Sequence, residues 1–221
     1  MPHELRFPDV PTASDALVFA QRAARLGDGA VRLRAQDGLL VMTSAPLAPR
    51  TLLEATPTIL GMRIIAVDPE VVCDLVVDAS TLRASGETHL ALPDSAVTAP
   101  WAGISPPRSG WEASGETAAA TLASRAQWGI AAVAEAVPTD AGDDVVHAVR
   151  ASIWGAADED LAGLPLGVAF AAFALGFIAG EEQALIRRNG PWTRVSLSRG
   201  HVLVRGTVRN GLTAVRTTGA A

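Results

Sequence analysis

Residues 164–180 form a 17-residue segment without a charged side chain, and this segment constrains the fold more than any other feature. A helix that is apolar on all sides must be covered by the core of its own chain or by another subunit. The segment is barely long enough to cross a bilayer, Pro165, Gly167 and Gly176 interrupt it, and acidic residues flank both ends. We therefore expect residues 166–178 to form a core helix or a subunit interface, and not a membrane span.

The N-terminal part combines one helix signal with several strand signals. A helix is expected over residues 12–27, with Thr12 or Ser14 as its N-cap. Residues 30–35 alternate apolar and polar positions, and Asp37-Gly38 then leads into residues 39–43, a pattern typical of a β-hairpin. Further strands are expected at residues 61–67, 71–77 and 88–92.

Proline, glycine and serine concentrate between residues 93 and 112, around Trp101 and Trp111. A free linker rarely carries two tryptophans, so we expect this connector to lie against the surface of the protein. Helices and a small sheet should follow, with hairpin turns at Asn189-Gly190 and Arg199-Gly200. The expected helices span residues 114–136, 143–154 and 166–178, and the expected strands span residues 184–188, 193–198 and 201–205.

These signals predict an α+β fold: an N-terminal, mainly antiparallel sheet unit with one flanking helix, then three helices and a small C-terminal antiparallel sheet. The expected division is an α+β unit over residues 1–95, a connector over residues 96–112, and a helical region ending in a β-meander over residues 113–221. The two units either stay separate or merge into one core. Beyond Gly206 we expect a loose tail. In the meander, alternation places Val195, Leu197, Val202 and Val204 inside, and Arg194, Ser196, Ser198, His201 and Arg205 outside.

Lysine is absent, so all 18 basic side chains are arginine. The absence of lysine excludes enzymes that form a Schiff base with their substrate and enzymes that need a phosphate-loop or kinase lysine. It also excludes enzymes that form an acyl intermediate on the serine of a Ser-x-x-Lys motif. Abundant arginine, alanine and glycine with only two asparagines indicate a GC-rich bacterial genome. One cysteine cannot form an intramolecular disulfide and the first residues carry no secretory signal pattern, so we expect a soluble cytoplasmic protein.

No residue pattern indicates a recognisable catalytic, nucleotide or metal site. Cys73 is expected on the apolar face of its strand, where a thiol is inert. Asp143 and His147 are spaced to meet on one helix face, but two ligands do not make a metal site, and we expect neither metal nor cofactor. The second hypothesis is an enzyme or small-ligand-binding protein whose site combines Asp74 and Asp78, on one strand face, with arginines.

Charge is distributed unevenly along the chain. The net charge is −5, but residues 181–221 carry seven arginines against two glutamates, a balance of +5, which leaves −10 for the remainder, with a dense acidic stretch at residues 135–160. Arginine binds carboxylate and phosphate groups with two parallel hydrogen bonds. The candidates for binding an anion or a partner are Arg187, Arg188, Arg194, Arg199 and Arg205. We expect them to pair with the protein's own acidic residues 158–160, and an external anion is the alternative.

Three helices followed by a hairpin resemble a winged helix-turn-helix in layout only. Residues 166–178 would be the recognition helix, yet they offer no arginine, asparagine or glutamine to a base edge. The acidic net charge also opposes phosphate binding, so nucleic acid is a disfavoured partner. The sequence therefore predicts a non-catalytic binding protein that self-associates through residues 166–178 and binds a protein or an anionic small molecule.

Overall fold

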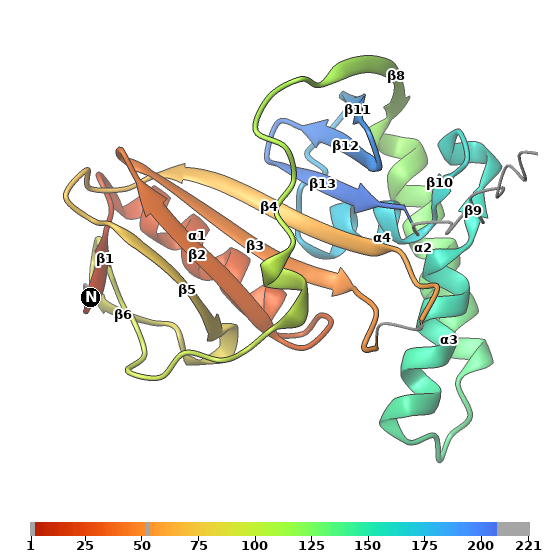
Figure 1. Cartoon of the computed structure of the whole chain (residues 1–221), viewed down its shortest axis with the longest axis horizontal. Helices are drawn as coiled ribbons and strands as arrows, with labels where there is room; N and C mark the ends of the chain where they lie inside the picture. The colour runs from red at the N-terminus through yellow and green to blue at the C-terminus, as the bar shows by residue number, and fades with distance from the viewer. Residues whose placement is uncertain (1–2, 52–53, 207–221) are drawn as a thin grey trace, which may run out of the picture.

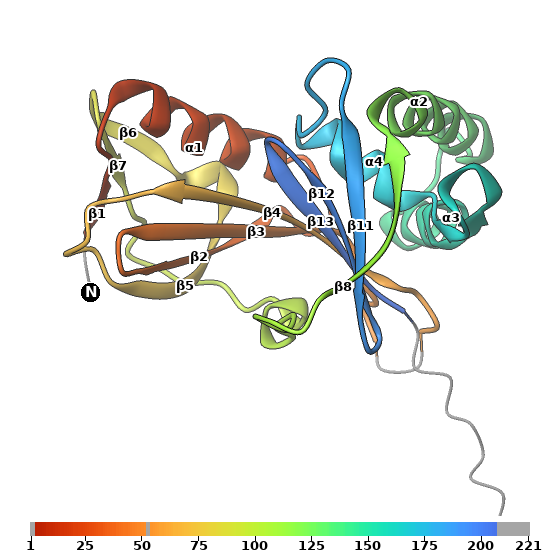
Figure 2. The same ribbon diagram turned by 90° about the horizontal axis from the view of Figure 1, so that it is seen from above.

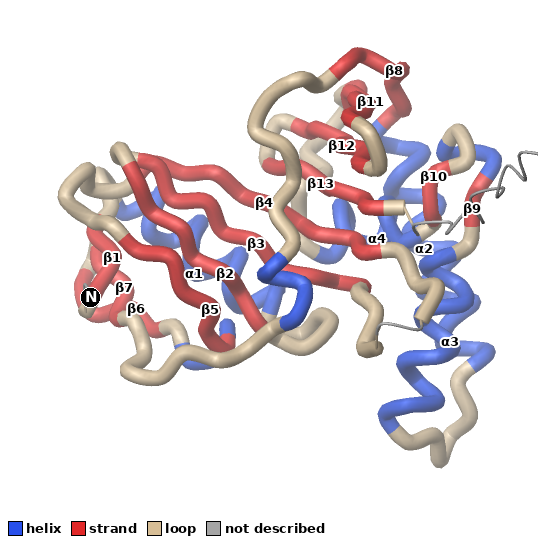
Figure 3. The backbone as a smooth tube through the Cα atoms, viewed as in Figure 1, coloured by secondary structure: helices blue, strands red, loops and turns tan. Residues whose placement is uncertain are grey.

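The computed structural model describes residues 3–51 and 54–206. Its fold is α+β, as predicted, with one large antiparallel sheet and four helices among these residues (Figure 1 and Figure 3). The eight strands of the sheet are, from edge to edge, β5 (Cys73–Asp78), β2 (Ala30–Gln36), β3 (Leu39–Leu47), β4 (Thr58–Ala66), β13 (Gly200–Arg205), β12 (Trp192–Leu197), β11 (Gln183–Asn189) and β8 (Glu112–Ala118). Pairing of β4 with β13 joins the N-terminal and C-terminal strands into this one sheet.

The helices lie on one face of the sheet, and the connector crosses the other face (Figure 2). They are α1 (Val10–Ala23), α2 (Ala119–Ala136), α3 (Asp143–Gly155) and α4 (Gly167–Ala174). Helix α1 packs on β3 and β4, while α4 packs on β4 and β13. Helices α2 and α3 pack on α4 and on each other, so α4 is enclosed between the sheet and two helices.

Smaller elements close the ends of the molecule. Strands β1 (Glu4–Arg6), β7 (His89–Ala91) and β6 (Arg83–Gly86) form a three-stranded sheet, and β7 contacts α1. Leu5 and Leu90 of this sheet are buried in the main core. Strands β9 (Ala157–Asp158) and β10 (Leu164–Pro165) form a short ladder between α3 and α4. The described residues also contain three 3-10 helices: η1 (Ala79–Thr81), η2 (Pro100–Gly103) and η3 (Glu159–Leu161).

Helix α1 begins earlier than predicted. Its N-cap is Asp9, whose Oδ1 accepts a hydrogen bond from the Thr12 backbone N–H at 2.7 Å, so the predicted caps Thr12 and Ser14 are wrong. Pro11 lies in the first turn, where its missing N–H costs nothing. The helix ends at Ala23, ahead of Gly27.

Residues 112–118 are a strand and not the first turn of a helix, which corrects the predicted start of α2. They pair with β11 in antiparallel register, so a neighbouring strand satisfies their backbone groups. Such pairing depends on a segment that is distant in the sequence, and local propensity does not reveal it.

The apolar segment is a core helix, which confirms one of the two alternatives. Gly167, Val168, Ala169, Ala171 and Ala172 of α4 are buried within the chain, whereas Phe173 is 41% exposed. Most of this helix is therefore covered by its own chain and little of it is left for the predicted self-association. It is also shorter than expected. Among the described residues, no helix has the length and apolar character needed to cross a membrane.

A Schellman motif ends α4 after two turns. The N–H of Phe177 donates to the Ala172 carbonyl at 2.8 Å, and the N–H of Gly176 donates to the Phe173 carbonyl at 3.0 Å. Gly176 has a φ of 73°, a left-handed conformation that glycine adopts without strain. This turn sends Leu175 and Phe177 back into the core.

Both faces of the sheet carry a core. Val195, Leu197, Val202 and Val204 are buried on the helix side, which confirms the predicted alternation of the C-terminal meander. On the opposite face a second cluster contains Trp192, Leu203 and Trp101 of the connector, and Trp101 is 4% exposed. The connector therefore lies against the sheet, as expected. The tail predicted to be loose lies outside the described residues.

Candidate partner-binding site

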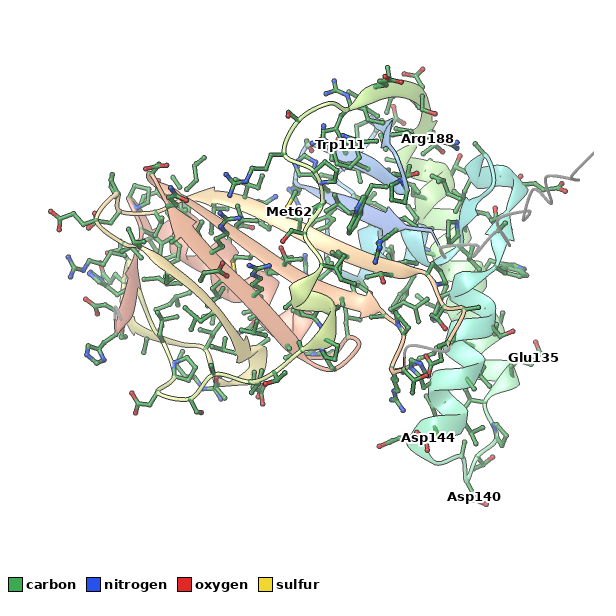
Figure 4. The ribbon with its side chains drawn as sticks, in the orientation of Figure 1. Met62, Trp111, Glu135, Asp140, Asp144 and Arg188 are labelled. Atoms are coloured by element: carbon green, nitrogen blue, oxygen red, sulfur yellow. The ribbon has the colours of Figure 1, made fainter. Side chains whose placement is uncertain are left out.

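Two hydrogen bonds anchor the connector to the rest of the protein. The Nε1 of Trp101 donates to Asp28 Oδ2 at 2.7 Å, and the Nδ2 of Asn189 in β11 donates to the Ser109 carbonyl at 2.8 Å. Between them the chain runs over β4 and β13 toward β8 (Figure 1). Trp111 thereby lies near the strands that carry the C-terminal arginines (Figure 4).

Arg187 of β11 and Arg194 of β12 are cross-strand partners. The guanidinium carbon of Arg194 lies 4.6 Å from the centroid of the Trp111 ring. Its Nε is buried and has no hydrogen-bond partner among the described residues. Burial, and then the charge of Arg187, lower the pKa of Arg194. Two like charges placed opposite each other, one of them partly desolvated, destabilise a sheet unless an anion compensates them.

His201 of β13 adds a polar group beside Arg194. Its Nδ1 lies 3.0 Å from Ser196 Oγ, its cross-strand partner. Burial lowers the pKa of His201, and the positive charges of Arg194 and Arg63 lower it further. The imidazole is therefore neutral at neutral pH, and the positive charge of this site comes from its arginines.

The structure brings together two of the five predicted arginines. Arg188 follows a register shift in β11 and pairs with Thr193. Arg205 lies opposite Trp192, and Arg199 lies in the β12–β13 turn at the other end of the hairpin. Arg187 and Arg194 are thus the two candidates that lie directly beside each other.

The predicted internal partner of these arginines is wrong. Asp158 accepts a hydrogen bond from Arg125 Nε at 3.0 Å, and Asp160 lies 3.6 Å from the same nitrogen. Within the described part of the chain, none of the five predicted arginines forms an ion pair. The acidic segment is occupied by an arginine of α2 that the sequence analysis did not single out.

The carboxylates of the enzyme hypothesis have structural roles. Asp74 and Asp78 face the same side of β5, as expected, but Arg32 donates to both oxygens of Asp74 at 2.7 and 2.8 Å. Asp78 accepts a hydrogen bond from the Ser80 N–H at 2.8 Å. These hydrogen bonds lower the pKa of each carboxyl group. A general base works best with a pKa near the operating pH, so this pair does not support catalysis.

The other reactive side chains are also engaged in packing or pairing. Cys73 is buried, and burial raises its pKa, so its thiol is protonated and inert, as expected. His147 Nε2 lies 3.3 Å from Glu54 Oε2, while Asp143 of the same helix does not pair with it. No group of three or more histidine, cysteine or acidic side chains within the described ranges is arranged to hold a metal ion.

Residues 1–103 match a family described as Domain of unknown function (DUF8010), and residues 106–209 match Domain of unknown function (DUF8185). No curated protein sequence matches the chain. Among solved structures, a DnaN sliding clamp (DNA polymerase III subunit beta) from Bartonella birtlesii bound to griselimycin is 12% identical, with a TM-score of 0.50 over 93% of this chain and 65% of the clamp. The DNA polymerase III beta subunit from Thermotoga maritima is 13% identical, with a TM-score of 0.50 and the same coverage.

The chain thus spans about 65% of the length of the clamps it resembles, and at these identities the likeness concerns the fold alone. The two family matches meet within the connector, between residues 103 and 106. Residues 1–103 and 106–209 are thus each similar to a family of unknown function, and the fold of the chain is similar to that of bacterial sliding clamps.

Proposed function

We propose that this chain is a non-catalytic binding protein, built on a fold similar to that of sliding clamps, which binds an acidic segment of a partner protein at the Arg187–Arg194 pair. The observation that carries the proposal is the buried Nε of Arg194, which lacks an acceptor among the described residues and lies beside a second arginine. A buried donor without an acceptor costs free energy. A partner carboxylate beside the pair would neutralise the like charges of the two arginines.

An acidic protein segment fits this site better than nucleic acid. The similar structures are DNA polymerase subunits, which makes DNA the alternative partner. Nucleic-acid affinity, however, requires basic groups against many successive phosphates. This chain has a net charge of −5, and the site offers two adjacent arginines and a tryptophan. Such a site suits one or two carboxylates and an adjoining side chain.

The test is titration of a hexaglutamate peptide into the whole protein, followed by tryptophan fluorescence, because Trp111 stacks on Arg194. We expect saturable binding that weakens with added salt. Arg187→Ala and Arg194→Ala should each weaken binding about tenfold, or about 1.4 kcal/mol. The matched control is Arg188→Ala, which removes the same charge from the next position of β11 and should change the affinity less than about twofold.

Two results would contradict the proposal. An equal loss in all three variants would mean that net charge, and not the Arg187–Arg194 pair, attracts the peptide. Tighter binding of a DNA oligonucleotide than of hexaglutamate, with the same sensitivity to Arg194→Ala, would make nucleic acid the partner. A neutral hexaglutamine peptide checks that the response requires carboxylates.

Self-association stays a prediction, but its predicted surface changes. Most of helix α4 is covered by its own chain, whereas β8 lies at the edge of the sheet, where β11 is its one strand neighbour among the described residues. Most residues of β8 are exposed. An open strand edge pairs readily with another strand. We therefore propose β8 as the self-association surface.

A further inference from the structure

A second group of arginines lines a pocket on the helix-bearing face of the sheet. The pocket has a volume of ≈450 Å³, within the usual range for small-ligand sites. Its arginines come from three different elements: Arg22 from α1, Arg63 from β4, and Arg199 from the β12–β13 turn. Because elements from both halves of the chain meet there, we call it the seam pocket.

The floor of the seam pocket is apolar and tightly packed. Phe19, Leu175 and Phe177 line it, and the rings of Phe19 and Phe177 are stacked with centroids 6.2 Å apart. Gly61 of β4 and Gly200 of β13 make this packing possible, because a Cβ at either position would collide with Phe177 or Leu175. The side chains of Leu175 and Phe177 therefore pack directly against the backbone of two strands.

The charges in the seam pocket are unbalanced. Asp15 neutralises Arg63, whose Nε donates to Asp15 Oδ2 at 2.7 Å. Arg22 donates through one Nη to the Leu175 carbonyl at 2.9 Å, which leaves its other N–H groups available. Arg199 is exposed and forms no ion pair within the described part of the chain. Three arginines against one aspartate leave two uncompensated positive charges, in a chain whose net charge is −5.

Gly176 contributes to the placement of Arg22. It lies in the left-handed conformation that ends α4, and a Cβ there would occupy the space of the Arg22 guanidinium. The same turn exposes the Leu175 carbonyl that receives the Arg22 hydrogen bond. The pocket therefore holds one arginine in a fixed position, and a second, Arg199, at its rim.

We propose that the seam pocket binds a small organic anion that joins a phosphate or carboxylate group to an apolar body. The anionic group would face Arg22 and Arg199, since Arg63 is already paired. The apolar body would contact the exposed side chains of Pro11 and Val18, above the buried Phe19, Leu175 and Phe177. This site is separate from the Arg187–Arg194 pair and does not depend on the function proposed above.

The experiment is isothermal titration calorimetry of the whole protein with phenyl phosphate. Inorganic phosphate and benzyl alcohol serve as probes of the anionic and apolar halves. We expect phenyl phosphate to bind saturably and at least about tenfold more tightly than either half alone. Benzoate in a parallel titration distinguishes a preference for carboxylate from one for phosphate.

Arg199→Ala should weaken phenyl phosphate binding about tenfold, because Arg199 is a surface side chain whose removal leaves the fold intact. Arg25→Ala is the matched control, since Arg25 is an exposed arginine close to α1 that does not line the pocket, and it should leave the affinity unchanged. Arg194→Ala should also leave it unchanged. Absence of saturable binding up to about 10 mM, or equal affinity in Arg199→Ala and wild type, would overturn the proposal.

Discussion

Arg125 contacts the carboxylate of Asp158, whose side chain is 8% exposed, and this one contact removes the main acidic candidate for pairing with the C-terminal arginines. On the other half of the sheet Arg32 pairs with Asp74, a carboxylate of the enzyme hypothesis. Arg194 instead stacks on Trp111 and retains a buried N–H without an acceptor among the described residues. At the scale of single residues, the binding candidates are therefore the arginines that the fold leaves uncompensated.

His201 gives a residue-scale prediction of pH dependence. Burial, with Arg194 and Arg63 nearby, lowers its pKa in the folded state below the ordinary value of 6.5. Between the two pKa values the unfolded chain binds more protons, so the free energy of unfolding falls as the pH drops below about 6.5. Urea midpoints measured from about pH 7.5 to about pH 5.5, above the range where carboxylates titrate, should show this decrease.

The variant His201→Gln should show a smaller decrease over the same pH range, because glutamine does not titrate. His3→Gln, at an exposed position, should behave like the wild type. An unchanged pH profile in His201→Gln would mean that another group causes the decrease.

At the scale of elements, the β12–β13 hairpin separates two chemically different faces. Val202 is completely buried on the helix side, and Leu185 of the neighbouring strand β11 is 45% exposed. Val202→Asp buries a carboxylate without a partner and should lower the free energy of unfolding by about 3–5 kcal/mol. Leu185→Asp makes the same kind of change at the exposed position and should cost less than about 1 kcal/mol. Urea denaturation measures both, and similar midpoints for the two variants would refute the assigned faces.

At the scale of the whole molecule, one eight-stranded sheet joins both halves of the chain, and α4 packs between this sheet and the outer helices. We propose on this basis that the two predicted units share one core. The sheet remains open at β8, whose exposed edge is the predicted site of self-association. Sedimentation velocity at micromolar concentration should therefore detect a dimer or a larger species.

The variant Ser114→Pro tests whether the exposed edge of β8 mediates self-association. Ser114 is the residue of β8 that has no register partner in β11, because it lies at the irregularity of the β8–β11 ladder. Proline at this position removes a backbone N–H from β8 but leaves the residues that pair with β11 unchanged. The variant should sediment as a monomer while its urea midpoint stays close to that of the wild type. A wild type that is already a clean monomer would remove the hypothesis.

Local sequence patterns predicted several helices and turns correctly, because neighbouring residues determine the conformation of these elements. Asp37 and Gly38 adopt the left-handed conformations that a tight hairpin needs, and β2 and β3 flank them as expected. Helix α3 occupies residues 143–155, close to the predicted range. The missed features depend on distant partners: β8 is a strand because β11 lies beside it, and Trp111 covers Arg194 because the connector crosses the sheet.

The candidate site also combines features that the sequence predicts with features that depend on distant parts of the chain. Sequence alone identified an arginine-rich end and a tryptophan-bearing connector, but not that Arg187 and Arg194 would be neighbours while Arg199 would join Arg22 and Arg63. Composition and alternation determined the α+β class, the buried faces of the strands and the absence of lysine chemistry, because each follows from side chains a few positions apart. Tertiary structure decided which charges are paired and which are left free, because Coulomb and hydrogen-bond interactions act over a few ångströms of space and not of sequence.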